Sequence, residues 1–502
     1  MSFLNASSDL NSIEEVLPAG MKTGLSQSSL LLQRKRVKVV PQGGQTLGTP
    51  STTVAAGAGN RQLSFLLSGN GGLIDPRSAV LNYYVSVSGT TGPVTVDDGH
   101  PLGIVNVLLG GQPLEQITNA CRLTNMEMTL GGSKAYYQTA GSLQGFALLS
   151  EDLNITLPGA GTNANIASVG QYGYVANNIY SANVRLVKPA AVQTGSQFVG
   201  EQRSIPLSLI SGFFRCKQYI PDMLGDLTLI ASTLSASEYV FNAGASITGD
   251  YALDGLSIEY DVVFPNPAYT AVLRNVMTAP NDALMIAYES AIVSTGAVVA
   301  ESNSAIKEST LIVSRATSNL VRASLVFIAS TGQSTQVFPG QSCFAHAGVS
   351  SAIIRVGSST YPNFPAYGDA SMFSMSLAAY GSPANENGTI TNRALWAQST
   401  KCGTSGGTPT SFETASLVYT GGSATDVKFA YGDRFVLAYG FRNAKGESEE
   451  VDLDGINMSQ ASGSQLQWVI QSAPCEDYQP YVALTGIRVI KCSGGAVSIV
   501  GA

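Results

Sequence analysis

Apolar and polar residues alternate along many short segments of this chain, the pattern of a β-strand with one face buried and one face in water. The clearest case is residues 256–262, where Leu, Ser, Ile, Glu, Tyr, Asp and Val follow one another. After Phe264 the period changes, because prolines interrupt the run and apolar residues from Tyr269 to Val276 then recur at helical spacing. Residues 204–277 are therefore expected to hold the last strands of one β-domain and a helical bridge to another.

The same alternation and apolar runs predict further strands on both sides of that stretch. Gly, Ser, Thr, Asn and Pro clusters separate the runs and indicate turns. Strands are expected at 61–69, 79–89 and 103–111 in the first half, and at 282–293, 309–318, 320–330, 350–368, 434–442, 447–459, 464–471 and 481–491 in the second.

Two short segments carry helical spacing instead. Within residues 112–130 it starts from Leu114 and Ile117, and within residues 370–380 it competes with a local alternation. The sequence of residues 141–200 predicts a long, loop-rich segment between strands, with little regular helix. Each half thus combines several strands with one short helix, which suggests a duplicated fold without a visible residue-level repeat.

Length and composition agree with several β-rich domains. The chain has 502 residues, of which 44% are hydrophobic, only 12% are charged and 53 are glycine. A chain of this length exceeds one ordinary core, so two or three domains are expected. The low share of charge suggests that much of its surface is buried against other copies, since interface cores are depleted in charged residues.

The net charge of −7 argues against a general nucleic-acid binder. The one basic cluster is Arg34, Lys35, Arg36 and Lys38, which lies in an expected N-terminal arm of residues 1–59 whose second part has linker composition. The cluster reads either as a solvated run of charges or as an arm that contacts nucleic acid or anionic lipid.

No convincing catalytic or metal-binding constellation appears in the sequence. The two histidines, His100 and His346, have no metal-ligand spacing and are expected in a loop or core. A GxSxG string at 403–407 and a loose glycine motif at 159–161 both lack the strand and helix that their chemistry requires.

The acidic clusters have plain structural interpretations as well. Asp97 and Asp98 read as a turn, and the alternating acids Asp452 and Asp454 read as a wet strand face or, alternatively, a cation site at a subunit contact. Six scattered cysteines without a CxxC pair read as reduced thiols. With no secretory leader at the N-terminus, we expect synthesis in the cytosol or nucleus.

Several stretches, taken in order, resemble the major capsid proteins of double jelly-roll viruses, namely polinton-like viruses, virophages and their large-DNA-virus relatives. They are a strand, glycine-aspartate turn and strand at 62–87; a strand, glycine turn and short helix at 104–128; an apolar strand, aromatic turn and Ile-Pro at 204–229; a strand, Gly-Ser turn, Tyr-Pro segment and helix at 353–381; and a Gly/Ser turn and strand at 452–470. The resemblance covers roughly residues 61–495.

The resemblance implies an all-β fold of two consecutive eight-stranded jelly rolls, with short helices and long surface loops. The expected organisation is an arm at 1–59, a first roll at 60–264, a helical linker at 265–281 and a second roll at 282–502. It implies a non-enzymatic major capsid protein of the virion, without cofactor, metal or small-molecule substrate. Homotrimers would form pseudo-hexagonal capsomers that tile an icosahedral shell around the genome.

The implied partners are further copies of the chain, neighbouring capsomers, and minor capsid and penton proteins. In this interpretation Arg34, Lys35, Arg36 and Lys38 lie beneath the shell and contact the genome or an inner membrane. Three alternatives remain: a capsid protein with one jelly roll and a projecting β-domain, a β-rich adhesin or carbohydrate-binding protein, and a β-sandwich hydrolase. The scarcity of histidine and of paired acid motifs argues against the hydrolase.

Overall fold

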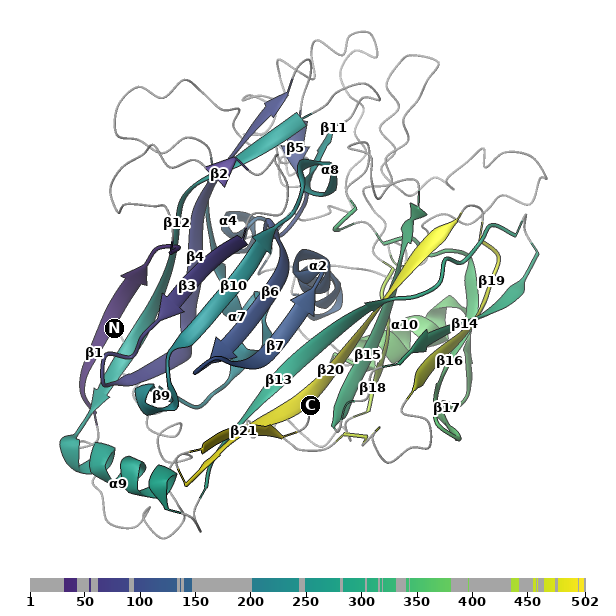
Figure 1. Ribbon diagram of the computed structural model, residues 1–502. Helices are drawn as coiled ribbons and strands as arrows, with labels where there is room; N and C mark the ends of the chain where they lie inside the picture. The colour runs from purple at the N-terminus through teal and green to yellow at the C-terminus, as the bar shows by residue number, and fades with distance from the viewer. Residues whose placement is uncertain are drawn as a thin grey trace.

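The computed structural model describes the strands and helices of two sandwiches that stand side by side (Figure 1). The described residues are 31–42, 54–55, 62–89, 94–132, 136, 140–146, 201–242, 249–279, 283–302, 305–314, 317, 319–330, 340–342, 344–380, 396, 435–441, 455–456, 458, 465–474, 477–494 and 496–500.

The first sandwich consists of two facing antiparallel sheets. One sheet has the order β1-β12-β4-β8 and the other the order β3-β10-β6-β7. These eight principal strands are β1 (Leu31–Val39), β3 (Gln62–Leu67), β4 (Leu73–Gly89), β6 (Leu102–Leu109), β7 (Gln112–Thr118), β8 (Glu201–Pro206), β10 (Leu227–Thr233) and β12 (Gly249–Pro265). Short extra strands are β2 (Val54–Ala55), β5 (Val94–Val96), β9 (Ile220–Pro221) and β11 (Val240–Asn242).

The second sandwich repeats this plan. Its sheets have the orders β13-β20-β15-β18 and β14-β19-β16-β17. The strands are β13 (Leu284–Thr295), β14 (Lys307–Val313), β15 (Leu320–Ala329), β16 (Val349–Val356), β17 (Ser359–Tyr367), β18 (Leu437–Gly440), β19 (Leu466–Ser472) and β20 (Tyr478–Ser493), and β21 (Ala496–Val500) adds to β20.

Numbered within each sandwich, the eight principal strands have the same order in both. In one sheet the first, eighth, third and sixth strands lie side by side in that order. In the facing sheet the order is second, seventh, fourth and fifth. This double Greek-key arrangement is the jelly roll. The fold of two consecutive eight-stranded jelly rolls is therefore confirmed.

The two rolls also share a local unit, a tight hairpin followed by a helix. In the first roll Gly110 and Gly111 connect β6 to β7 with φ of 55° and 84°, the positive values of a two-residue hairpin turn. In the second roll Gly357, with φ of 59°, opens the corresponding two-residue turn between β16 and β17. Helix α2 (Ala120–Gly131) follows the first hairpin and α10 (Gly368–Ala378) follows the second.

The helices differ from the sequence expectation in one detail. Leu114 and Ile117 lie on β7, so the expected helical face at 112–130 is a strand followed by a helix that begins at Ala120. Helix α9 (Pro267–Thr278) lies within the expected linker. It begins where Asn266 accepts a hydrogen bond from the Ala268 amide and Pro267 occupies the first helical position. Short helices also occur at α4 (Ser142–Gln144), α7 (Leu207–Ile210) and α8 (Ala236–Tyr239), with 3-10 turns η6 (Gly212–Arg215) and η7 (Asp222–Leu224).

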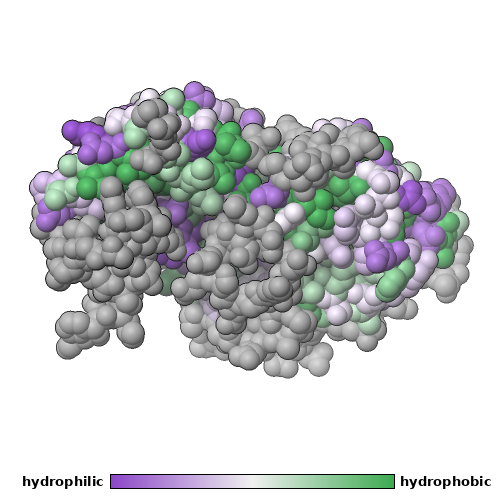
Figure 2. All heavy atoms as spheres, turned by 90° about the horizontal axis from the view of Figure 1, so that it is seen from below, coloured by the Kyte–Doolittle hydropathy of each residue, from purple (hydrophilic) through white to green (hydrophobic). Residues whose placement is uncertain are grey.

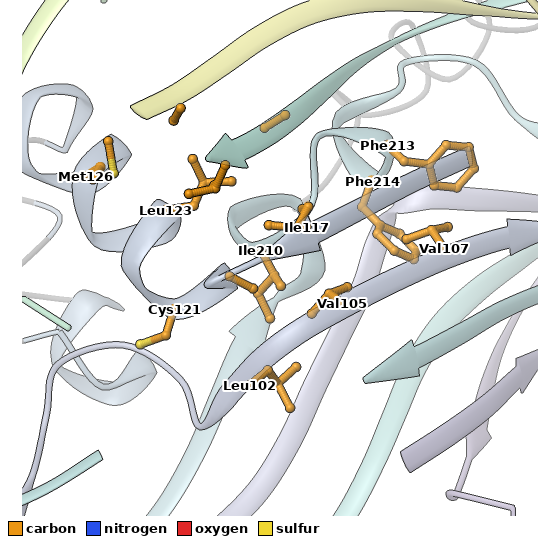
Figure 3. Packing of buried hydrophobic residues seen from close by; sticks show 14 of the residues in the cluster. Leu102, Val105, Val107, Ile117, Cys121, Leu123, Met126, Ile210, Phe213 and Phe214 are labelled. Carbon is orange, nitrogen blue, oxygen red and sulfur yellow. The ribbon is translucent and has the colours of Figure 1, made fainter. Parts of the chain in front are cut away.

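Alternating burial along the strands produces the core. In β10, for example, every second residue from Leu227 to Thr233 is buried, and the intervening residues are half-buried. Figure 3 shows side chains from β6, β7, α2, α7 and η6, including Val107, Ile117 and Phe214, packed toward one another. Most of the buried apolar residues described in both rolls belong to one continuous cluster, so the two sandwiches share a core.

The first roll begins earlier in the chain than the expected boundary at residue 60. The expected arm of residues 1–59 contains β1, which pairs with β12 along its length and is the first strand of the roll. Its polar sequence hid it, because among the side chains described from Gln33 to Val39 this edge strand buries only part of Val37 and Val39. Apart from 31–42 and 54–55, the expected arm lies outside the described residues.

Candidate functional site at the junction of the rolls

Strand β7 of the first roll lies beside β13 of the second, and this contact is the centre of the junction (Figure 1). The Thr118 hydroxyl donates to the Val293 carbonyl at 3.1 Å, and the Tyr288 hydroxyl donates to the Leu114 carbonyl at 2.9 Å. Phe213 packs edge-to-face on Tyr288 with ring centroids 5.4 Å apart. Aromatic area and hydrogen bonds to backbone carbonyls thus join two sheet edges that would otherwise be exposed.

Glu115 on β7 places a buried carboxylate in this contact. It accepts hydrogen bonds from the Ala291 amide of the second roll at 2.8 Å, from the Phe213 amide at 3.3 Å and from the Ser211 hydroxyl. Burial raises the pKa of Glu115, and these three donors oppose that rise. Because Ala291 lies on edge strand β13, the carboxylate satisfies an amide that β20 does not reach.

Glu127 on α2 connects the rolls by ion pairs. Its carboxylate bonds to Arg322 of β15 at 2.9 Å and to Arg215 of η6, which also lies 3.5 Å from Glu289 of β13. Burial alone would raise the pKa of Glu127, but the two guanidinium groups outweigh burial and lower it. The Arg322 guanidinium also stacks 4.0 Å over the ring of Tyr380.

Residues 340–342 of the second roll contact residues of the first roll, and we call these residues the tongue. All three of its residues are buried. Asp97 accepts the Gln341 amide at 2.6 Å and the Ser342 hydroxyl at 2.5 Å. The Gln341 carbonyl accepts from the Asn125 side-chain amide at 3.1 Å.

Arg122 on α2 holds the beginning of the same tongue. Its guanidinium donates twice to the Gly340 carbonyl, at 3.1 and 3.3 Å, and stacks 4.0 Å over the ring of Tyr481 on β20. Asp97 was expected to be part of a simple turn, but it is a buried contact between the rolls. No local pattern could have shown this, because its partners lie more than 240 residues later in the chain.

The predicted basic cluster lies on β1 and is largely paired within the chain. Arg34 contacts Asp75 and Asp261 at 3.1 and 2.9 Å, and Arg36 contacts Asp261 and Glu259 at 3.3 Å each. The Lys38 ammonium is 3.7 Å from Glu259. Lys35 lies on the opposite face of the strand and is exposed.

We call this set of cross-strand pairs the ion-pair ladder. The cations retain 42–50% side-chain exposure, so each pair is screened by solvent. Contact of these four residues with a genome or membrane stays a proposal.

The described histidines and cysteines, whose side chains could in principle serve as catalysts or metal ligands, lie in the core. His100 is fully buried, contacts the Thr124 hydroxyl at 2.9 Å, and has its pKa lowered to about 3 by burial. His346 is fully buried against Phe435 and contacts Asp369. Among the cysteines that the structure describes, Cys121, Cys216 and Cys492 are buried thiols.

Other sequence candidates fall outside the described residues. These are the GxSxG string at 403–407, the glycine motif at 159–161, and Asp452 with Asp454. Within the described part of the chain, no group of three or more His, Cys, Asp or Glu side chains could hold a metal ion. No helix in that part is long and apolar enough to cross a membrane.

Large hydrophobic side chains also reach the surface, most of them on the second roll. Figure 2 shows hydrophobic residues at the surface of one face of the molecule, interspersed with polar ones. Phe364 and Tyr367 on β17 are 72% and 63% exposed, and Ile312 on β14 is 49% exposed. Strands β14 and β17 are the two edges of one sheet, so exposed apolar groups flank it on both sides. The remaining such residues described are Leu143, Met223, Met285, Val298, Ile306 and Val500.

No protein-family model matches the sequence, and no curated protein matches it. Among solved structures, the chain is similar to PBCV-1 VP54 as fitted into a reconstruction of the virophage Sputnik, with 11% identity over 96% of this chain and 100% of that chain, at a TM-score of 0.49. It is also similar to the mavirus major capsid protein, with 10% identity over 97% and 95% of the two chains, and to the Faustovirus major capsid protein, with 9% identity over 97% of each, both at a TM-score of 0.49. The fold assignment itself rests on the strand order of the two rolls.

Proposed function

We propose that this chain is a viral major capsid protein, a structural protein whose trimers tile the shell that encloses a genome. The observation that carries this proposal is the repetition of one jelly-roll strand order within a single chain, with both rolls on one continuous core. Three copies of such a chain supply six similar walls around a threefold axis. A pseudo-hexagonal unit of this kind can contact six neighbours in nearly equivalent ways.

The junction supports this function because a shell subunit must keep its two rolls at a fixed angle. Buried Glu115 and Asp97 and the half-buried Glu127 each bond across the junction, and each would lose a partner in the other roll if the rolls separated. The paired rolls therefore form one building block rather than two domains on a flexible linker.

The chemistry of the described residues agrees with a protein whose activity is binding. The histidines are buried within the rolls, and the acids at the junction are occupied by structural hydrogen bonds and ion pairs. We infer that the chain is not an enzyme.

The exposed apolar groups suit contacts with further copies of the chain. Phe364, Tyr367 and Ile312 flank one sheet of the second roll, and large apolar side chains at centres of interfaces carry much of the binding energy. We propose that these edges contact a neighbouring copy in the trimer. Minor capsid and penton proteins as further partners, assembly in the host cytoplasm or nucleus, and a genome or membrane contact near β1 belong to the same proposal.

Size-exclusion chromatography with light scattering on the purified full chain tests the proposal. The expected result is a stable species of three times the 52.2 kDa chain mass. A monomer at micromolar concentration would favour a binding module such as an adhesin and would overturn the trimeric capsid proposal.

A further inference from the structure

The junction between the rolls joins two particular strands. The fifth strand of the first roll, β7, lies beside the first strand of the second roll, β13. Because both rolls have the same strand order, each has a fifth and a first strand at equivalent positions. The other fifth strand, β17, and the other first strand, β1, lie outside this contact, and Figure 1 shows them at opposite sides of the molecule.

Burial differs between these equivalent strands. Half of the residues of β13 are buried, whereas none of the side chains described in β1, from Gln33 to Val39, is buried. Strand β7 buries Leu114, Glu115 and Ile117, whereas β17 buries only Ala366. The two strands that meet at the junction are therefore covered, and their counterparts at the outer edges are not.

The helix that follows each fifth strand shows the same difference. Helix α2 follows β7, and it bonds to the second roll through Arg122, Asn125 and Glu127. Ten of its 12 residues are buried. Helix α10 follows β17 and buries only Met372 and Ser376. The second roll thus presents to solvent the same strand and helix that, in the first roll, form the junction.

The exposed side chains of β17 and β1 are chemically complementary. Strand β17 presents the rings of Phe364 and Tyr367, and β1 presents a row of cations. Cations are attracted to the faces of aromatic rings. A guanidinium forms hydrogen bonds in its plane and stacks by its face, so Arg34 and Arg36 can contact a ring and keep their carboxylate partners.

The junction within the chain already uses these kinds of contact. The guanidinium of Arg122 on α2 lies 4.0 Å from the ring centre of Tyr481 on β20, so a cation–aromatic contact joins the two rolls. The Thr118 hydroxyl on β7 also donates to the Val293 carbonyl of β13, a strand at the edge of its sheet. Strand β1 is likewise the edge of its sheet, so it offers backbone groups to a neighbouring strand.

We propose that β17 and α10 of one copy contact β1 of the next copy head to tail, as β7 and α2 contact the second roll within the chain. This inference rests on the proposed trimer and names its contact surfaces. A contact between two different surfaces repeats around a rotation axis and closes into a ring. In a ring of three chains, six junctions of one kind alternate within and between chains, and every first and fifth strand is covered.

Cross-linking through introduced cysteines tests which surfaces meet. Gln33→Cys on β1 and Asn363→Cys on β17 lie at exposed positions and leave the cations and rings unchanged. The two variants, co-expressed as differently tagged full-length chains and treated with a short bismaleimide, are expected to cross-link to each other. Each variant expressed alone is expected to cross-link no more than the parent chain. The double variant is expected to give a covalently closed ring of three chains.

Light scattering on the same samples separates this inference from the trimer itself. A trimer whose mixed variants do not cross-link above the parent chain overturns the head-to-tail contact and leaves the capsid proposal standing. Cross-linking of either variant alone shows that like edges meet and also overturns it. A chain that stays monomeric overturns both proposals. Ser237→Cys, an exposed position on α8, is the matched control in both mixtures, and cross-linking of the control to the same extent counts against the contact.

A second variant tests the chemistry of the contact. Arg34→Lys combined with Arg36→Lys keeps both charges opposite the acids of β12 but removes the planar groups that stack on rings. The association constant of the trimer, measured by sedimentation velocity at several concentrations, is expected to fall about fivefold or more. Trypsin cleavage within residues 34–38 checks that β1 stays attached in the variant. An unchanged association constant overturns the contact between the arginines and the rings.

Discussion

Two acids at the junction respond to pH in opposite directions because their neighbours differ. Glu127 lies between Arg215 and Arg322, which outweigh burial and lower its pKa, whereas no arginine of the described residues is bonded to Asp97, whose pKa burial raises. Glu127 therefore contributes stability above the pKa of an unfolded glutamic acid and loses it as the pH falls through its own lowered value. Asp97 contributes most in acid and least above neutral pH.

The Glu127 network predicts a large cost for removing its charge. Glu127→Gln leaves Arg215 and Arg322 partly buried without their shared carboxylate, so the free energy of unfolding should fall by about 3 kcal/mol at pH 7. Urea denaturation of the variant and the wild type measures this difference. Glu308→Gln is the control and should change stability by less than about 0.5 kcal/mol. Equal stability of Glu127→Gln and wild type would show that the network does not fasten the rolls.

The sequence correctly predicts the setting of both histidines and of the three cysteines that the structure describes, but it does not reveal the junction contact of Asp97. The absence of ligand spacing around His100 and His346 predicted loop or core residues, and both are buried. The pair Asp97 and Asp98 beside a glycine looks like any turn. What makes Asp97 a junction residue is a segment far along the chain, and nothing within a local window points to it.

At the scale of elements, the turn of Gly110 and Gly111 between β6 and β7 is constrained by its surroundings as well as by its backbone conformation. Gly110 and Gly111 both have positive φ, but their surroundings differ. A Cβ atom on Gly110 would lie 2.9 Å from the Leu224 carbonyl oxygen, while one on Gly111 would meet nothing within 4 Å. The first glycine is therefore required by space as well as by conformation.

This difference predicts an asymmetry between two alanine substitutions. Gly111→Ala should lower the free energy of unfolding by about 1 kcal/mol, the usual penalty for a non-glycine residue at positive φ. Gly110→Ala should cost roughly 1–3 kcal/mol more, because backbone atoms must also move. Thermal or urea denaturation of the two single variants checks the order, and equal costs would contradict the close approach of residue 224.

Strand β1 is held mainly by the ion-pair ladder and by pairing with β12. In Arg36→Glu, a carboxylate would stand directly opposite Asp261, and the strand should detach more easily by roughly 1–2 kcal/mol. Trypsin cleavage within residues 34–38 reports detachment and should be faster in this variant and, for the wild type, faster at high salt. Lys35→Glu makes the same charge change on the other face of the strand and should have a smaller effect. Similar cleavage rates for the two variants would contradict the ladder.

The elements that the sequence predicted well are those with one buried face. Strand β10 alternates in burial as it alternates in polarity, residues 258–262 of β12 do the same, and α9 begins at its asparagine and proline. Strand β1 was missed since its charges are neutralised by acids on β12 more than 220 residues away. The predicted helix starts too early because the spacing of Leu114, Ile117 and Cys121 fits one face of a helix. In the structure Leu114 and Ile117 lie on β7, and Cys121 lies on α2.

At the scale of the whole molecule, one chain contains the same strand order twice on a shared core, and the second roll exposes apolar groups at both edges of one sheet. The duplication was predictable from the repeated pattern of strands and a short helix. The junction was not, because its contacts join segments that carry no common local signal.

The exposed edge residues predict a separation of folding from assembly. Phe364→Ser and Tyr367→Ser remove side chains that are 72% and 63% exposed, so the thermal stability of the monomer should change little. Self-association should weaken by about 2 kcal/mol or more per interface if these residues are buried by a neighbouring copy. Sedimentation velocity at several concentrations measures this. Unchanged self-association would place the interface elsewhere, and Glu308→Gln is again the control.

Electron microscopy of the purified full-length oligomer tests the central claim most directly. The account predicts particles with a threefold axis and six similar lobes, two from each chain, in a pseudo-hexagonal outline. Particles with only two lobes, or an assembly without threefold symmetry, would contradict it.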